Sequence, residues 1–180
     1  MKQVYRYNPY SAPYYTYTQV YNPYNYYYPA WAQQIYPPSN NSYIELRDYG
    51  PNPLVINIED ATKQNTNYRT ALWTGNNFQL TLMSINTGED IGLEMHPDVD
   101  QFIRIEEGQG LVVMGDSQDR LNFQRRVSDD YIIIIPAGKW HNVINTGNRP
   151  LKLYSIYAPP EHPHGTVHRS RMDSGMQHDR

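Results

Sequence analysis

Short strand-like runs separated by turn signals fill the chain from residue 45 onward, and this pattern restricts the fold more than any other feature. The runs are alternating or continuously apolar over four to eight positions, as half-buried and buried strands are. Phrases typical of turns, such as NTGED, EEGQG and PAGK, lie between them. Only residues 57–68 could hold a helical turn, so the sequence predicts an all-β antiparallel sandwich or barrel. The predicted strand runs are Pro53–Ile58, Phe78–Ile85, Phe102–Ile105, Gly110–Met114, Leu121–Val127, Tyr131–Ile135, His141–Ile144 and Leu151–Tyr157.

The first 44 residues differ sharply in composition from the rest. Thirteen of the 18 tyrosines and six of the 14 prolines lie there, and no charged residue occurs from Tyr7 to Ile44. Repeated proline favours extended, polyproline-like backbone over a packed fold. The segment is therefore predicted to be an arm. It is either a disordered leader or an adhesive assembly segment, because tyrosine rings stack and their hydroxyls form hydrogen bonds.

The composition of this arm resembles that of tyrosine-rich segments in bacterial spore coat and exosporium proteins. The resemblance implies that the protein is buried in a layered shell, with spore-layer proteins as partners of the arm and dityrosine cross-links between chains.

Length, charge and cysteine content limit the classes of function. A chain of 180 residues has room for one ordinary domain and a tail, and its net charge of -3 gives no basic field for nucleic acid. No apolar run approaches the roughly 20 residues that cross a bilayer, and the N-terminus MKQVYRYNPY lacks the features of a signal peptide, so we expect a soluble protein made in the cytoplasm. Without cysteine, any metal must be held by His, carboxylate, amide or water.

Two phrases combine a turn with side chains that can bind metals. In the first, Glu94 and His96 are followed by Gln101; in the second, His141 follows a turn at residues 136–138. Because residues two apart on a strand share a face, Glu94 and His96 are predicted to point together into the interior. The loop after His96 would let Gln101 face inward from the next strand, and His141 would approach from the opposite side.

The spacing of these phrases is identified as the two-motif pattern of the cupin family, over about residues 70–158. The matching positions are Gly88, Glu94, His96, Gln101 and Gly108 in the first motif, and Pro136, Gly138, His141 and Asn145 in the second. The resemblance implies a small jelly-roll barrel with one divalent metal inside, held by two histidines and a glutamate from the first motif and a histidine from the second. Here Glu94 stands at the first histidine position and Gln101 at the glutamate position, while Asp130 replaces the leading glycine of the second motif.

The exchanged ligands leave two interpretations of a metal site. The resemblance implies a divalent metal at four residues, Glu94, His96, Gln101 and His141, whose charge equals that of the usual set. Without Gln101, the other three form a two-His, one-carboxylate set of the kind used by non-haem iron(II), with the amide as a labile fourth ligand or a hydrogen-bond donor to water. Mixed oxygen and nitrogen donors suit Mn, Fe, Ni or Zn without selecting among them. The alternative is a barrel that has lost its metal.

Three classes of function follow from these features. The first is a metalloenzyme of isomerase, epimerase or dioxygenase type acting on a small polar or sugar-like substrate, with Glu94 and His141 catalytic through the metal. The second is a structural, coat-associated spore protein, and the third is a binding or sensing module. The resemblance also implies a homodimer, since family members commonly pair their barrels edge to edge.

The C-terminal residues 161–180 are polar and have no apolar period. Their four histidines, at positions 162, 164, 168 and 178, are predicted to be solvated rather than to bind metal. The phrase YAPPEHPHGTVH resembles the C-terminal extension of small bacterial cupins often labelled mannose-6-phosphate-isomerase-like, a label that says little about the reaction. The predicted organisation is an arm at 1–44, a barrel at 45–160 and a tail at 161–180.

Overall fold

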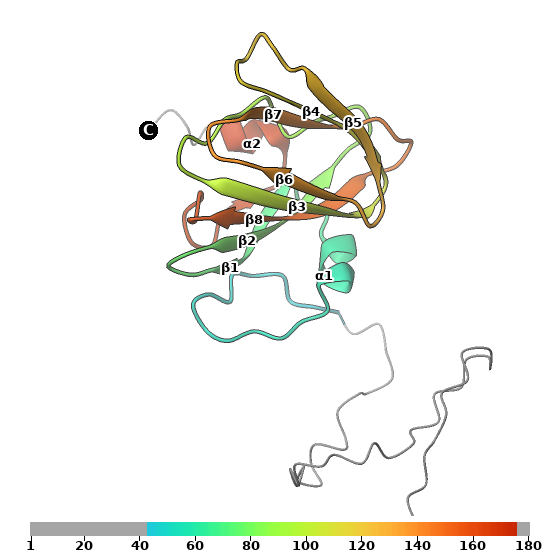
Figure 1. Ribbon diagram of the computed structural model, residues 1–180. Helices are drawn as coiled ribbons and strands as arrows, with labels where there is room; N and C mark the ends of the chain where they lie inside the picture. Colours follow the sequence, from blue (N-terminus) through green and yellow to red (C-terminus); the bar gives the residue numbers. More distant parts are fainter. Residues whose placement is uncertain (1–42, 176–180) are drawn as a thin grey trace, which may run out of the picture. The chain divides into compact units, whose positions relative to one another are not determined.

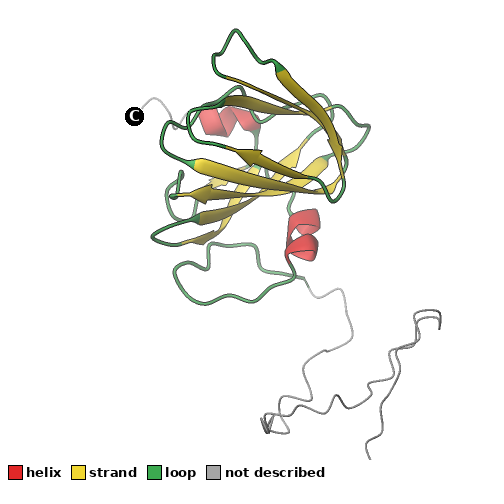
Figure 2. Cartoon of the chain, in the orientation of Figure 1, coloured by secondary structure: helices red, strands yellow, loops and turns green. Residues whose placement is uncertain are grey.

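The computed structural model describes residues 43–175, so the predicted arm, apart from Tyr43 and Ile44, lies outside the described residues. The described chain forms two antiparallel sheets with two short helices, α1 (Ile58–Gln64) and α2 (Arg171–Gly175) (Figure 1, Figure 2). One sheet has six strands in the order β6-β3-β8-β2-β1-β9, and the other has three in the order β5-β4-β7. The predicted all-β jelly-roll is therefore confirmed. Neither of the two described helices is long and apolar enough to span a membrane.

The strands agree with most of the predicted runs. Seven of the eight runs are strands whose ends differ from the predicted ends by no more than two residues. The strands are β1 (Arg69–Thr74), β2 (Gln79–Ile85), β3 (Asp100–Glu107), β4 (Gln109–Gly115), β5 (Phe123–Ser128), β6 (Ile132–Ile135), β7 (Trp140–Asn145), β8 (Leu151–Ala158) and β9 (Val167–His168).

The predicted strand at residues 53–58 is wrong, and two strands were not predicted. Asn57 accepts a hydrogen bond from the Asp60 backbone N–H at 3.3 Å, which caps α1 and ends the extended run at the helix start. The helical turn expected within residues 57–68 is this helix. Strand β1 escaped prediction because its first four residues are all buried, so the sequence RTALWT has no alternation of apolar and polar positions.

Apolar side chains fill both faces of the six-stranded sheet. On the inner face, residues such as Met83, Ile103 and Leu153 pack against Val112 and Val143 of the three-stranded sheet. On the outer face, a second cluster of Ala61, Leu72 and Leu82 is covered by partly buried residues of the 43–58 segment, among them Ile44, Leu46, Leu54 and Ile56. Each fully buried aliphatic side chain of this kind contributes about 1.5–3 kcal/mol to stability. Residues from 43 onward are thus part of the packed unit.

The inner face of the six-stranded sheet changes character along its strands. In register, Gln101 of β3 lies beside Tyr157 of β8, which lies beside Gln79 of β2. The next inward row places Ser155 between Ile103 and Thr81, whereas the row after it places Ile105, Leu153 and Met83 side by side and continues to Arg69 of β1. One end of this face is therefore mostly polar, and the other is apolar as far as Arg69.

The C-terminal segment folds against the barrel, which corrects the expectation of a solvated tail for residues 161–175. Strand β9 pairs with β1, and the Thr166 carbonyl accepts a hydrogen bond from the Ala71 N–H at 2.8 Å. The buried Gln79 amide donates to the His162 carbonyl at 2.9 Å and accepts from the His162 N–H at 3.0 Å. Because main-chain bonds to buried polar side chains hold this segment, it carries no hydrophobic period that a sequence pattern could reveal. His178 lies outside the described residues.

The turns before β6 and β7 use left-handed backbone. Asp130, at the position where the family pattern has glycine, has φ of 70° and is the one positive-φ residue other than glycine between residues 43 and 175. Asp tolerates this region better than most residues, so the turn geometry survives the replacement. Gly138 has φ of 78° and donates its N–H to the His96 carbonyl at 2.7 Å, which fixes the entry into β7 beside the first motif.

Candidate metal centre

The first motif lies antiparallel to β7 and pairs with it at two isolated bridges, Asp90 with Ile144 and Glu94 with His141. The N–H and carbonyl of Glu94 exchange hydrogen bonds with those of His141, at 3.0 and 2.9 Å, so the two residues are directly opposite each other. Directly opposite residues of an antiparallel pair point to the same face, and His96 follows two residues after Glu94. The predicted common direction of Glu94 and His96 therefore holds, but the expectation that His141 approaches from the opposite side is wrong. It is Gln101, on β3, that comes from the opposite sheet.

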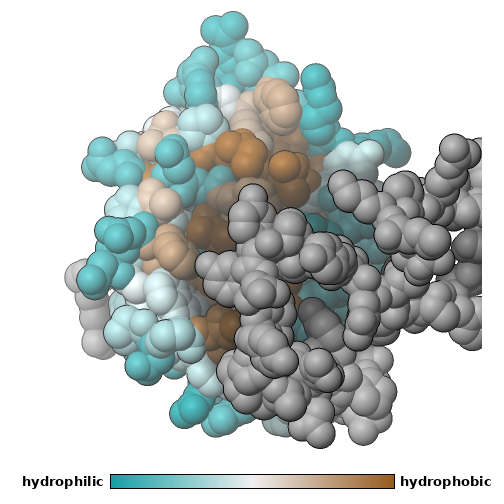
Figure 3. Space-filling model, turned by 60° about the horizontal axis from the view of Figure 1, so that its bottom comes forward, coloured by the Kyte–Doolittle hydropathy of each residue, from teal (hydrophilic) through white to brown (hydrophobic). Residues whose placement is uncertain are grey.

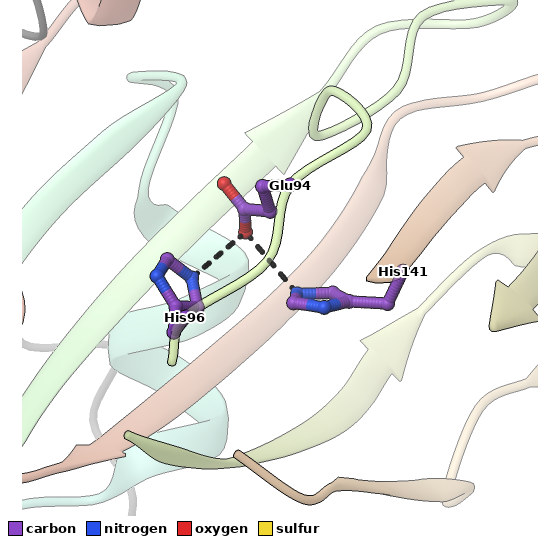
Figure 4. Close-up of side chains that lie close together, drawn as sticks. All are labelled: Glu94, His96 and His141. Atoms are coloured by element: carbon purple, nitrogen blue, oxygen red, sulfur yellow. Dashed lines mark ion pairs between the residues drawn. The ribbon is translucent and has the colours of Figure 1, made fainter. Parts of the chain in front are cut away.

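The three side chains converge in the interior (Figure 4). Glu94 Oε1 lies 3.5 Å from His96 Nε2 and 3.4 Å from His141 Nε2. All three ligand atoms lie within 4.8 Å of one another, and among residues 43–175 this is the one group of three or more His, Asp or Glu side chains so arranged. Bonds of about 2.0–2.2 Å to a shared ion put ligand atoms roughly 3–3.5 Å apart. The spacing thus fits a single divalent ion.

Hydrogen bonds outside the triad fix which nitrogen of each imidazole faces inward. His141 Nδ1 lies 2.9 Å from the Lys139 carbonyl oxygen, and His96 Nδ1 lies 3.2 Å from Glu161 Oε1. A carbonyl and a carboxylate can only accept, so each Nδ1 carries a proton and each Nε2 is the nitrogen that faces the site. Glu94 Oε1 and both Nε2 atoms are buried and have no hydrogen-bond partner among the described residues. Two imidazole nitrogens and a carboxylate oxygen that face one another in a buried place fit a cation between them, either a proton or a metal ion.

Electrostatics favour the same conclusion. Burial opposes ionisation of Glu94, but His141, His96 and Arg69 outweigh it and hold the pKa of Glu94 well below its usual range. Burial likewise opposes charge on His96, yet Glu94 and Glu161 outweigh it and raise the pKa of His96. Glu94 is therefore an anion at neutral pH, and the field that attracts a proton to His96 attracts a metal cation equally well.

Gln101 is buried on the inner face of β3, with one end of its amide bound. Its Nε2 donates to Ser155 Oγ at 2.9 Å, and its Oε1 has no partner among the described residues. A serine hydroxyl can donate or accept, so Ser155 alone does not fix the amide orientation. A metal ion bound at the triad would favour the amide orientation that leaves Gln101 Oε1 free to face it. The role of Gln101 as a fourth ligand stays a prediction.

Four further polar residues surround the triad and were missed as site residues by sequence reasoning: Arg69, Tyr157, Glu161 and His162. The His162 ring packs edge-on against the Tyr157 ring at 5.1 Å, and the Tyr157 ring against the His96 ring at 5.8 Å. Burial, followed by the charge of Arg69, lowers the pKa of His162 to about 3, so its imidazole is neutral at physiological pH. From the sequence, Glu161 and His162 could be assigned only to a polar tail, because neither belongs to a strand-like run.

A barrel of two antiparallel sheets with an imidazole, imidazole and carboxylate cluster inside defines a cupin with a candidate metal centre. Residues 81–157 match the family model described as Cupin domain. The chain is 67% identical over 134 residues to the uncharacterized protein YrkC of Bacillus subtilis (strain 168), which covers 74% of this chain and 72% of that protein. It is 42% identical over 122 residues to the uncharacterized protein L612 of Acanthamoeba polyphaga mimivirus, covering 67% of this chain and 74% of that protein.

A solved structure also resembles this chain in sequence and fold. The crystal structure of BH2720 from Bacillus halodurans is 66% identical, with a TM-score of 0.72, and the match covers 72% of this chain and 98% of that chain. A double-stranded β-helix protein from Klebsiella pneumoniae, at 14% identity and a TM-score of 0.50, covers 66% of this chain and shares the fold. The chain belongs to the cupin family.

Proposed function

We propose that the barrel holds one divalent metal ion at Glu94, His96 and His141 and acts as a metalloenzyme on a small polar or sugar-like molecule. One observation carries the proposal. Two imidazoles, each fixed through Nδ1 by an outer acceptor, direct their Nε2 atoms at a buried carboxylate oxygen that has no other partner among the described residues. Gln101 is proposed as a fourth ligand, and Mn, Fe, Ni and Zn all suit the donors.

Each residue of the site has a defined part in this proposal. A bound divalent cation supplies Lewis acidity, which polarises a carbonyl or hydroxyl oxygen of a substrate. Glu94 supplies the negative charge and an oxygen that can take up a proton. Burial, only partly offset by Arg69, raises the pKa of Tyr157, so its hydroxyl keeps its proton and donates hydrogen bonds. Tyr157 and the neutral His162 therefore position a substrate and do not exchange protons with it at neutral pH.

Metal content tests this function. We expect the natively purified protein to contain about one equivalent of a divalent metal by elemental analysis, and its melting temperature to fall on chelation. Glu94→Ala and His141→Ala should lose the metal, whereas Glu107→Ala, at the end of β3 beside Arg149, should keep it. Unchanged metal content in both site variants would refute the proposed site.

A second function, coat-associated and structural, is favoured by the composition of the N-terminal 44 residues. Here the tyrosines would hold the protein in a spore layer and cross-link it. The best deletion removes residues 1–42 only, since Ile44 donates its N–H to Gln64 Oε1 at 2.9 Å and accepts from Gln64 Nε2 at 2.5 Å. The full chain should form dityrosine fluorescence and sedimenting assemblies on oxidation, and the deletion variant should not. Equal assembly of the two proteins would contradict this function.

We also propose a homodimer formed through exposed sheet edges. Ile132 and Ile134 of the edge strand β6 are 57% and 58% exposed, which is unusual for isoleucines of a folded barrel. On the face shown in Figure 3, part of the surface is hydrophobic, and hydrophilic side chains lie to the left of it and above it. Sedimentation equilibrium should give a dimer that the double variant Ile132→Lys, Ile134→Lys converts to monomer. A wild-type protein that stays monomeric at about 100 μM would contradict it.

A further inference from the structure

Arg69 is a buried cation without a charged partner among the residues that the structure describes. It is the first residue of β1, lies opposite Met83 of β2 and His168 of β9, and is 3% exposed. No carboxylate among residues 43–175 forms an ion pair with it. Its Nη2 lies 3.9 Å from Met83 Sδ, its guanidinium lies 5.7 Å from the centre of the Tyr68 ring, and it interacts with the Tyr157 hydroxyl. Its Nε has no hydrogen-bond partner among the described residues.

Such a guanidinium is costly to bury, because it cannot lose its proton in a protein interior. The arginine is not needed to hold the strands together, since β1 and β2 are paired by their backbones. Its side chain points to the same interior as the triad, and its charge is one of those that act on Glu94 and Tyr157. A buried, unpaired guanidinium beside a site indicates a place for an anion.

The shape of the guanidinium indicates what kind of anion fits there. Arg69 is 3% exposed and presents one positive charge on a planar group, which a carboxylate can meet with two parallel hydrogen bonds. A neutral sugar would leave this buried charge without a charged partner.

Neutral polar atoms supply further contacts for the same ligand. The Tyr157 hydroxyl, Thr81 Oγ1 and Gln101 Oε1 are buried on the inner face of the six-stranded sheet and have no hydrogen-bond partner among the described residues. Unpaired buried polar atoms cost stability unless something binds them. They suit a ligand with several oxygens more than an apolar one.

We propose that the interior binds a small 2-hydroxy or 2-oxo carboxylic acid, with the carboxylate on Arg69 and the 2-oxygen directed to Glu94, His96 and His141. This inference rests on the proposed function, because the second oxygen needs the metal. It narrows the substrate from a small polar molecule to an organic acid. Arg69 gives a planar pair of donors that matches a carboxylate, and Tyr157 gives a further donor.

The test uses the full chain loaded with Co²⁺, whose visible absorption reports changes among its ligands. Glycolate and pyruvate are titrated in parallel with glycolamide, a neutral analogue of glycolate, and with inorganic phosphate. Glycolate is expected to bind at least about tenfold more tightly than glycolamide, because a charge-assisted pair replaces a neutral hydrogen bond. Equal binding of glycolate and glycolamide, or preferred binding of phosphate, overturns the inference.

Variants assign the preference to Arg69. Arg69→Met keeps the length of the side chain and removes its charge, and should abolish the preference for glycolate while Co²⁺ still binds. Arg69→Lys keeps the charge and should retain part of the preference. Arg125→Met, on the exposed face of β5, is the control and should change neither property. If Arg69→Met still prefers glycolate to glycolamide, the inference is wrong. If that variant does not fold, the wild-type titrations and those of Arg69→Lys test the inference instead.

The two proposals fail in different ways. If the wild-type protein binds Co²⁺ but shows no preference for carboxylates, the proposed metal site remains supported and the proposed organic acid ligand is contradicted. A wild-type protein that binds no Co²⁺ removes both.

Discussion

The two ends of the inner face of the six-stranded sheet serve opposite purposes. At the apolar end, Ile105, Leu153 and Met83 lie side by side and have no polar side-chain groups to satisfy, and only Arg69 of β1, the next residue of this row, is charged. At the polar end, Gln101, Tyr157 and Thr81 are equally buried, yet each has an atom with no hydrogen-bond partner among the described residues. The same strands β3, β8 and β2 supply both ends.

This difference shows which end is optimised for stability. Burial of aliphatic rows stabilises the barrel, whereas unpaired buried polar groups each cost about 1–3 kcal/mol. A fold tolerates such groups where they serve binding, and they lie beside the triad. Substitutions at the apolar end should therefore lower stability and leave metal binding intact. Substitutions at the polar end should change the binding of metal or ligand and cost little stability.

The largest effect is expected from Leu153→Ala at the apolar end. Removal of a fully buried leucine side chain should lower the free energy of unfolding by about 3 kcal/mol, through lost burial and the space left behind. The metal content of the folded protein should not change. Urea unfolding and elemental analysis measure the two quantities. Val55→Ala, at a fully exposed position, is the control and should cost less than about 1 kcal/mol. Loss of metal in folded Leu153→Ala would break the comparison.

The next effect concerns Asp48, which ties the C-terminal segment to the barrel. Its carboxylate accepts hydrogen bonds from the N–H of Gly165 at 2.9 Å, from the N–H of Thr74 at 2.9 Å and from the Thr74 hydroxyl at 2.6 Å. Burial raises the pKa of Asp48, but the hydrogen bonds from Thr74, Gly165 and Gly50 and the charge of His164 outweigh it, so the pKa lies below the ordinary 3.8. Asp48→Asn should cost about 2 kcal/mol at neutral pH.

The pH dependence follows from the sign of this shift. A carboxyl group with a depressed pKa in the folded state stabilises the fold fully above its unfolded pKa, near 3.8. This contribution is lost as the pH falls through the lower pKa of the folded state. Urea unfolding from about pH 6 to about pH 2.5 should therefore show the wild type losing its advantage over Asp48→Asn below about pH 4. Asp119→Asn, at an exposed turn, is the control. A constant difference across this range would contradict the role of ionised Asp48.

The sequence predicted the strands that alternate and the residues that fill family positions, because both are local patterns. Glu94 and His96 could be placed on one face from their spacing alone. The position of His141 could not, because nothing local shows that the first motif pairs with β7. Strand β1 and the burial of Arg69 were not predicted for a related reason. A strand covered on both faces has no alternation of apolar and polar residues, so an arginine within it cannot be distinguished from a surface cation.

The C-terminal segment shows the same limit more clearly. Its contacts are main-chain hydrogen bonds to Gln79 and Asp48, more than 80 residues earlier in the chain. Such contacts depend on the fold and leave no period in the segment itself. Glu161, which holds His96, therefore became visible only in the structure.

A smaller effect is expected from Glu161, which positions the triad from the polar end. Glu161→Ala removes the acceptor of His96 Nδ1, so the ring loses its fixed orientation, and metal affinity should fall about tenfold. Glu161→Gln retains an acceptor oxygen and should recover part of the affinity. Competition with a fluorescent chelator measures affinity, and urea unfolding of the metal-free protein should show little change. A loss of stability without a loss of affinity would make Glu161 a structural residue only. Glu45→Ala, at an exposed position, is the control.

The smallest effect, and the most direct test of the comparison, is expected from Thr81→Val at the polar end. Thr81 is 0% exposed and its hydroxyl has no partner among the described residues, so replacing it with a methyl group removes an unpaired polar atom at constant shape. The metal-free protein should be unchanged or up to about 1 kcal/mol more stable. Thr70→Val, on the opposite face of the same sheet, is the matched control. The Thr70 hydroxyl donates to Asn65 Oδ1 at 2.9 Å and accepts from Asn67 Nδ2 at 3.1 Å, so its loss leaves both partners unsatisfied and should cost about 1–3 kcal/mol. If Thr81→Val lowered the free energy of unfolding as much as Thr70→Val does, the Thr81 hydroxyl would contribute to stability. It would then no longer support a ligand at the polar end.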